Sequence, residues 1–224
     1  MTPVASLLHH LGRPGDLHLG TAHTGTPSRL STGLAVLDAI LGGGLPRGRV
    51  TELVGARSTG RTGLACAIAA GATGIGEVTA WIDAHDALDP ESAATTGLVL
   101  ARLLWVRPRQ PAEAFRAADL LLAAGGFGLV VLDVPDPAPA MRMPPWRRLS
   151  RAAERTGTTL LVLAPTPCTG PVAALGLEIT ARDVRWSGGP GRLTLLDGLA
   201  CHVHVARSRV GRPGGALELH SVCA

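Results

Sequence analysis

The chain has 224 residues, of which 46% are hydrophobic and 17% charged, and its mean hydropathy is +0.27. This length and composition exclude a disordered chain and favour one domain with a single buried core. The net charge of +4 and the pI near 9.4 permit contact with nucleic acid or with an acidic partner without proving either.

No apolar run approaches the roughly 20 residues that a membrane helix needs, and the first residues lack a signal-peptide pattern. We therefore expect a cytoplasmic protein that makes no membrane contact. The cysteines are far apart and form no CxxC pair, which argues against a zinc site or a disulfide framework. We expect buried free thiols at all four positions: Cys66, Cys168, Cys201 and Cys223.

The first part of the chain is predicted to be an arm. Residues 1–29 are rich in Gly, Pro, His and Thr, with one apolar stretch at 4–11 that could form one or two helical turns. The pattern of the chain changes at residue 30, so the core domain is predicted over 30–224. In it, Ser31 is predicted to cap a first helix that ends at Gly42.

The core pattern then alternates strands with helices. We predict strands at 49–54, 78–82, 128–133 and 158–164. Helices are predicted at 111–124, which is amphipathic, and at 146–155, which is basic. A Gly-rich loop at 55–62 opens a further helix, and a proline-rich loop is predicted at 135–145. Gly-punctuated segments at 192–196, 201–207 and 216–220 predict antiparallel edge strands. The fold class is therefore α/β, with a mainly parallel twisted sheet flanked by helices.

The Gly-rich loop, Gly-Ala-Arg-Ser-Thr-Gly-Arg-Thr, follows a strand and opens a helix, which is the context of a phosphate-binding loop. Its glycines let backbone N–H groups turn toward phosphate oxygens, and the helix N-terminus favours an anion. The hydroxyl of Thr62 would bind Mg²⁺. The residues predicted to bind a nucleotide are Gly55, Ser58, Thr59, Gly60, Arg61 and Thr62.

Arg61 stands where a phosphate-binding loop has lysine. A lysine ammonium is compact, whereas a guanidinium is a larger planar fork that need not fit the same pocket. Lysine is absent from the whole chain, so codon bias is an alternative explanation. We expect ATP and Mg²⁺ binding to be possible but not required, and hydrolysis to be impaired.

Asp133 ends the strand at 128–133 and fits the acid that holds Mg²⁺ beside Thr62. The alternative is an aspartate that only caps a turn. The phosphate-binding loop upstream favours the metal role.

Four motifs in one order resemble bacterial RecA: STGLAVLD at 31–38, GGGLPRGR at 42–49, the Gly-rich loop, and WIDAHDALDP at 81–90. The resemblance is dense from 30 to 136 and thinner but collinear to the end. It implies a RecA-type P-loop NTPase core.

The resemblance also implies losses at functional positions. His85 stands at the position of the glutamate that activates the attacking water in RecA, so no catalytic residue is expected. Ser92 replaces the adenine-stacking tyrosine, and Thr166 replaces the glutamine that senses the γ-phosphate. The segments matching the DNA loops of RecA, 134–145 and 165–173, are short, and we expect the large C-terminal domain to be missing.

A short RecA-like chain with a degraded ATP site resembles the ImuA family of SOS mutagenesis. That resemblance implies a non-hydrolysing scaffold in translesion synthesis that binds RecA and ImuB, an inactive Y-family polymerase homologue. One rival is an active DNA-stimulated ATPase, like a minimal recombinase or a clock-type RecA paralogue. Another is a cell-division inhibitor resembling SulA, which ranks third because SulA lacks a recognisable P-loop.

Arginines provide the candidate contact surfaces. Arg207 and Arg209 match two basic residues with which one RecA subunit touches the ATP of its neighbour, so we expect them to contact a RecA partner. The alternative is an edge strand whose arginines face water. A stripe on the basic helix would give weak, non-specific DNA contact, or else is a solvated face: Arg147, Arg148, Arg151 and Arg155. The tryptophans, Trp186 among them, are predicted to be core or interface anchors.

Overall fold

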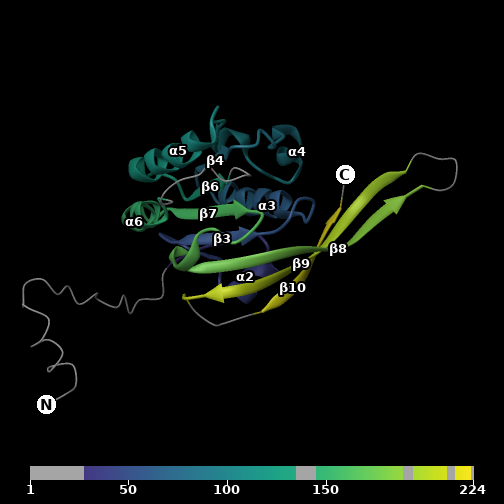
Figure 1. The fold of residues 1–224 in the computed structure, drawn as a ribbon. Helices are drawn as coiled ribbons and strands as arrows, with labels where there is room; N and C mark the ends of the chain where they lie inside the picture. Colours follow the sequence, from purple (N-terminus) through teal and green to yellow (C-terminus); the bar gives the residue numbers. More distant parts are fainter. Residues whose placement is uncertain (1–27, 135–144, 189–193, 211–214, 223–224) are drawn as a thin grey trace, which may run out of the picture.

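The computed structural model describes residues 28–134, 145–188, 194–210 and 215–222, and Figure 1 shows their arrangement. The elements in chain order are β1 (Arg29–Leu30), α2 (Ala35–Leu41), β2 (Leu45–Pro46), β3 (Val50–Val54), α3 (Arg61–Gly74), β4 (Thr79–Asp83), α4 (Pro90–Thr95), η1 (Leu100–Arg102), β5 (Leu103–Val106), α5 (Pro111–Ala124), β6 (Leu129–Asp133), α6 (Trp146–Thr156), β7 (Thr159–Ala164), η2 (Gly170–Val172), β8 (Leu175–Ser187), β9 (Leu195–Ser208) and β10 (Ala216–Val222).

One eight-stranded sheet organises the molecule, in the order β10-β9-β8-β3-β7-β6-β4-β5. Neighbouring strands from β8 to β5 run parallel, and β9 and β10 add antiparallel strands at one edge. The predicted α/β class, with a mainly parallel sheet and antiparallel edge strands, is confirmed. In this arrangement the carboxyl ends of β3, β4, β6 and β7 lie at one end of the sheet, where ligands bind in open α/β sheets.

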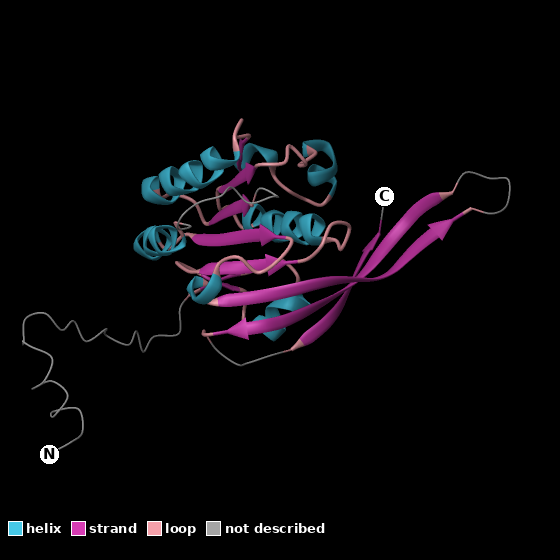
Figure 2. Ribbon diagram, viewed as in Figure 1, coloured by secondary structure: helices cyan, strands magenta, loops and turns pink. Residues whose placement is uncertain are grey.

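Helices cover both faces of the sheet (Figure 2). Alternate residues of a buried strand point to opposite faces, so Leu129 and Val131 of β6 pack in a core with α2 and α3. Val130 and Leu132 pack in a second core with α5 and α6. The sheet strands are therefore apolar on both faces, as parallel strands between helix layers require.

The first helix differs from its prediction. It begins at Ala35 rather than at Ser31, because Arg29 and Leu30 form strand β1, paired with β2. Ser31 does not cap the helix: its hydroxyl donates to Asp38 Oδ2 at 2.6 Å. Gly42 ends the helix in a left-handed conformation, as predicted.

The edge region departs most from prediction. Strand β8 was not predicted, and β9 is one continuous strand where two segments were expected. Gly198 does not interrupt β9, because it pairs with Arg185 on one side and with Val222 on the other. Helix α4 and strand β5 were also missed. The other predicted elements agree within one residue at each end, except that β10 runs two residues beyond its predicted end; α5 agrees at both ends.

Several sequence predictions concern residues outside the described part of the chain: most of the arm at 1–29 with its apolar stretch at 4–11, most of the loop at 135–145, and the start of the segment at 192–196. Among the described residues, no helix is both long and apolar enough to cross a membrane. Cys66 and Cys201 are buried free thiols as predicted, Cys168 is partly exposed, and Cys223 lies outside the described residues.

Candidate functional site

The Gly-rich loop connects β3 to α3 as predicted, and glycine is sterically required at its first position. A Cβ at Gly55 would lie 2.5 Å from Ile179 Cγ2 and 2.8 Å from the Ile179 carbonyl oxygen. Gly60 takes the left-handed conformation, with φ of 88°, at the N-cap of α3. The local chain therefore turns as a phosphate-binding loop does.

The loop forms one wall of a pocket of about 860 Å³. The structure brings most predicted site residues together around it: Ser58, Gly60, Arg61, Thr62, His85 and Asp133. Thr59 is buried beneath the loop, where its hydroxyl donates to the Ala56 carbonyl oxygen at 2.8 Å. Gly55 is likewise buried. Gly55 and Thr59 therefore support the conformation of the loop and do not line the pocket.

Arg61 is folded back onto its own loop. Its Nη1 donates to the Gly55 carbonyl oxygen, and its Nη2 lies 4.0 Å from Asp133 Oδ1. The side chain is 12% exposed. The guanidinium therefore contacts the Gly-rich loop and the acid at the end of β6.

Asp133 is buried and interacts with His85 across the pocket floor. Oδ2 lies 3.2 Å from His85 Nδ1. Burial raises the pKa of Asp133, while the charge and hydrogen bond of His85, and then Arg61, act in the opposite direction. Oδ1 has no hydrogen bond among the described residues, so it fits a Mg²⁺ ligand facing the pocket with the Thr62 hydroxyl.

Asp83, for which no role was predicted, positions the loop that carries His85. It is 1% exposed and accepts hydrogen bonds from Ala87 N at 3.0 Å, Leu88 N at 2.9 Å and Trp105 Nε1 at 3.2 Å. Its place at the end of a strand, opposite Asp133 in the next strand, was the available signal. The neighbouring acid, Asp86, is 67% exposed and pairs with Arg107 at 3.3 Å.

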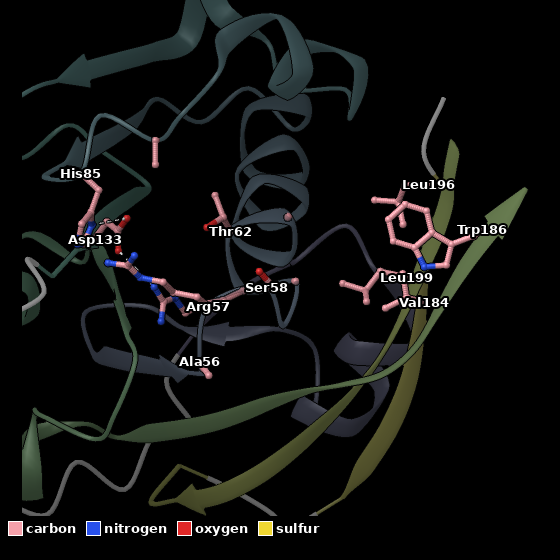
Figure 3. A pocket seen from close by; sticks show the side chains of 14 residues that line it. Ala56, Arg57, Ser58, Thr62, His85, Asp133, Val184, Trp186, Leu196 and Leu199 are labelled. Carbon is pink, nitrogen blue, oxygen red and sulfur yellow. Dashed lines mark hydrogen bonds and ion pairs between the residues drawn. The ribbon is translucent and has the colours of Figure 1, made fainter. Parts of the chain in front are cut away.

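The second wall of the pocket was not predicted. It comes from the β8–β9 hairpin, which extends beyond the rest of the sheet (Figure 1), and carries apolar side chains toward the Gly-rich loop (Figure 3). Trp186 belongs to this wall and is 59% exposed, so it is not a core residue. Only the pairing of β8 with β9 brings this tryptophan near the loop.

Comparison with known proteins agrees with this geometry. Residues 3–140, more than half of the chain, match the family model of the RecA N-terminal domain. The chain belongs to the RecA family. RecA of Clavibacter michiganensis subsp. michiganensis is 38% identical over 133 residues, and RecA of Rubrobacter xylanophilus is 37% identical over 133 residues; each match covers 59% of this chain.

These matches cover 37% and 39% of the two relatives, and a match to RecA of Mycobacterium leprae, 37% identical over 131 residues and 58% of this chain, covers 18% of that relative. The chain thus spans about two fifths or less of the length of these RecA proteins. Family membership establishes the RecA-like core and leaves the activity of the whole RecA protein to be tested on this chain.

Two positions at which the chain departs from RecA lie away from the pocket walls that the described residues form. Ser92, on α4, donates its hydroxyl to Asp89, the cap of that helix. Thr166 is exposed in the connection after β7. Neither residue lines the pocket, so neither offers a contact there.

Arg209 lies near the amino end of the parallel strands, away from the Gly-rich loop, whereas Arg207 lies at the level of Glu52, midway along β3. Arg209 N donates to the carbonyl oxygen of Ala174, just before β8 begins, and Arg209 is exposed. Arg207 is partly buried, and its Nη2 lies 3.9 Å from Glu52 Oε2. Glu52, for which no role was predicted from the sequence, is buried. It accepts hydrogen bonds from the backbone of the connection between β7 and β8.

The arginines of α6 are exposed on the outer face of that helix, whose inner face packs on α5 and β7. Arg148 pairs with Asp119 of α5 at 2.9 Å. Arg147 and Arg151, four residues apart, present their charges to solvent on neighbouring turns.

Proposed function

We propose that this RecA-family chain is an accessory protein of DNA damage tolerance, resembling ImuA. It would act as a non-hydrolysing scaffold in SOS mutagenesis and translesion synthesis, binding RecA and an ImuB-type Y-family polymerase homologue. The observation that carries the proposal is the state of the catalytic positions: His85 replaces the glutamate and contacts Asp133, while Arg61 replaces the lysine and contacts Gly55.

The charges of the site support impaired hydrolysis. The carboxylate that would hold Mg²⁺ has two polar neighbours of its own, because Asp133 Oδ2 lies 3.2 Å from His85 Nδ1 and Oδ1 lies 4.0 Å from Arg61 Nη2. Asp86, the nearest acid along the chain, does not line the pocket and pairs with Arg107. No carboxylate among the described pocket-lining residues other than Asp133 is therefore available to activate water.

A second candidate, an active DNA-stimulated ATPase, is favoured by one geometric feature. A histidine oriented by a carboxylate is a common general base, and His85 Nδ1 lies 3.2 Å from Asp133 Oδ2. The SulA-like alternative gains no support from a pocket built around a complete Gly-rich loop.

Steady-state ATP turnover, with and without single-stranded DNA, separates the two candidates. Loss of one transition-state contact typically lowers turnover by about 10²- to 10³-fold. We therefore expect turnover at least about 100-fold below that of a RecA assayed in parallel, and a rise in Arg61→Lys/His85→Glu. Robust turnover that disappears in both Thr62→Ala and His85→Asn would instead support the active ATPase.

Docking on RecA is proposed to use Arg209, with Arg207 beside it. Because Arg209 lies near the amino end of the parallel strands and the Gly-rich loop lies at their carboxyl end, the chain can present Arg209 to the ATP of a RecA protomer while its own degraded site faces away. Arg207 is held near the buried Glu52, whereas Arg209 is exposed and fits a phosphate contact better.

The docking test is retention on RecA filaments loaded with a slowly hydrolysed ATP analogue. We expect Arg209→Ala to weaken retention by about tenfold or more, the scale of a lost charge-assisted contact. Arg116→Ala, which removes an exposed arginine from α5, should leave retention unchanged. Equal retention of parent and Arg209→Ala, or equal retention on nucleotide-free RecA, would rule this interface out.

A further inference from the structure

The β8–β9 hairpin carries an apolar surface that the family role does not explain. We call it the hairpin platform, and its side chains all line the pocket: Val184, Trp186, Leu196 and Leu199. Cross-strand partners lie on one face of a sheet, and here Val184 pairs with Leu199 and Trp186 with Leu196. Trp186 is 59% exposed among aliphatic neighbours, and an exposed apolar patch of this kind indicates a binding surface for a ligand or a partner protein.

The platform begins at the Gly-rich loop itself. A Cβ at Gly60 would lie 3.1 Å from Leu199 Cδ2, so the loop and the first pair of the platform are in contact. The next pair, with Trp186, lies two residues farther along the hairpin, or about 7 Å at the usual rise of a strand. The pocket therefore has the Gly-rich loop and the N-terminus of α3 at one end and the apolar hairpin platform at the other (Figure 3).

The chemistry of the two ends specifies a class of ligand. At one end, the N-terminus of the 14-residue helix α3 meets Arg57 and Arg61, which favours an anion. The buried Asp133 Oδ1, without a hydrogen bond among the described residues, adds a site for a bound cation. At the other end an indole offers a flat face. The volume of about 860 Å³ falls within the usual range for small-molecule sites.

We propose that the pocket binds a nucleoside di- or triphosphate whose base stacks on Trp186, so that the hairpin replaces the aromatic face absent from Ser92. The base would be recognised by stacking of its ring on the indole, and not by hydrogen bonds to its edge. Among the platform side chains the indole N–H is the single polar group, so recognition of the base edge is weak. This inference stands apart from the accessory role, because it concerns nucleotide binding without turnover.

Calorimetric titration of the full chain with Mg²⁺ and ATP, GTP or inorganic tripolyphosphate tests the proposal. Stacking of a base on an aromatic side chain corresponds to about 5- to 150-fold in affinity. We expect ATP and GTP to bind within about threefold of each other, and both more tightly than tripolyphosphate. Trp186→Ala should weaken ATP and GTP by that factor and leave tripolyphosphate within about twofold, while Trp186→Phe retains most of the affinity.

Leu195→Ala is the matched control, because Leu195 is 61% exposed on the same hairpin and does not line the pocket. Fluorescence gives a second readout. Trp81 and Trp146 are 1% and 6% exposed, and the partly buried Trp105 does not line the pocket, so nucleotide should quench mainly Trp186, and Trp186→Phe should remove most of the quenching. Circular dichroism checks that each variant is folded.

Three results would overturn the proposal: no nucleotide binding, tripolyphosphate binding as tight as ATP binding, or equal ATP affinity in Trp186→Ala and Leu195→Ala. If Trp186→Ala weakened retention on RecA filaments and left ATP affinity unchanged, the platform would be a protein-docking surface instead. None of these results would alter the test of Arg209, so failure of this inference is distinguishable from failure of the proposed function.

Discussion

Asp133 is a buried carboxylate whose charged neighbours act on it in opposite directions. Burial raises its pKa above the ordinary value of 3.8, and Asp83 adds to this effect. His85 and Arg61 lower the pKa, since positive charge favours the carboxylate. Burial dominates, so the folded protein holds a proton at Asp133 more readily than the unfolded chain does.

Asp133→Asn is expected to gain stability relative to the parent as the pH rises. Between 3.8 and the raised pKa, the folded state keeps a proton that the unfolded chain has lost, so this group lowers the stability of the parent as the pH increases. Asparagine does not titrate there. Urea unfolding from about pH 4 to about pH 7 measures the difference, with the exposed Asp183→Asn as control. A difference that shrinks as the pH rises would contradict this account.

Helix α5 was predictable at both ends because its signals are local. Gln110 and Glu113 form a capping box, Pro111 occupies the first turn, and Gly125 ends the helix. Strand β8 was missed although apolar residues alternate with small or polar ones in both of its halves. The pairing with β9 shifts by one residue midway, which puts Val184 and Trp186 out of phase with the apolar residues before them, and the outer half is exposed, so no single buried face appears in the sequence. Its existence depends on pairing with β9, which no local window of sequence contains.

The same distinction divides the candidate site. Spacing along the chain was sufficient to find the Gly-rich loop, and motif order was sufficient for His85 and Asp133. Trp186 could not be placed, because it reaches the pocket through the hairpin. Glu52 and Asp83 could not be recognised either, since an acid in an apolar strand gains its role from the backbone N–H groups that a distant or later loop brings to it.

Asp83→Ala is expected to destabilise the protein by about 2–4 kcal/mol, because the buried N–H of Leu88, the partly buried N–H of Ala87 and the Trp105 indole would lose their acceptor. Trp105→Phe removes one of these hydrogen bonds and should cost about 1 kcal/mol. Urea denaturation measures both changes. Hydrogen exchange at Ala87 and Leu88 should rise in Asp83→Ala and stay near the parent rate in Trp105→Phe. Unchanged exchange in Asp83→Ala would show that the loop is held by other contacts.

The molecule distributes its charge over three separate regions. The pocket beside the Gly-rich loop lies at the carboxyl end of the parallel strands, Arg209 lies near the amino end, and the α6 arginines lie on one helical face of the sheet. A single partner is therefore not needed to account for all of the arginines. The net charge of +4 attracts a polyanion to the whole surface, and local pairs decide which side chains contact it.

Single-stranded DNA is expected to bind weakly and without sequence preference, with a dissociation constant of about 10⁻⁴ to 10⁻⁶ M at physiological salt. Arg147 and Arg151 are exposed on neighbouring turns of α6, whereas Asp119 compensates the charge of Arg148 at 2.9 Å. Each of Arg147→Ala and Arg151→Ala should therefore reduce the slope of log K against log salt by about 0.7, the value for one phosphate contact on a single strand. Arg148→Ala is the matched control and should change the slope less.

Fluorescence anisotropy of a labelled oligonucleotide over a salt series gives the slopes. Salt-insensitive binding, or equal slopes for the parent and Arg147→Ala/Arg151→Ala, would show that the α6 arginines face solvent and do not contact DNA.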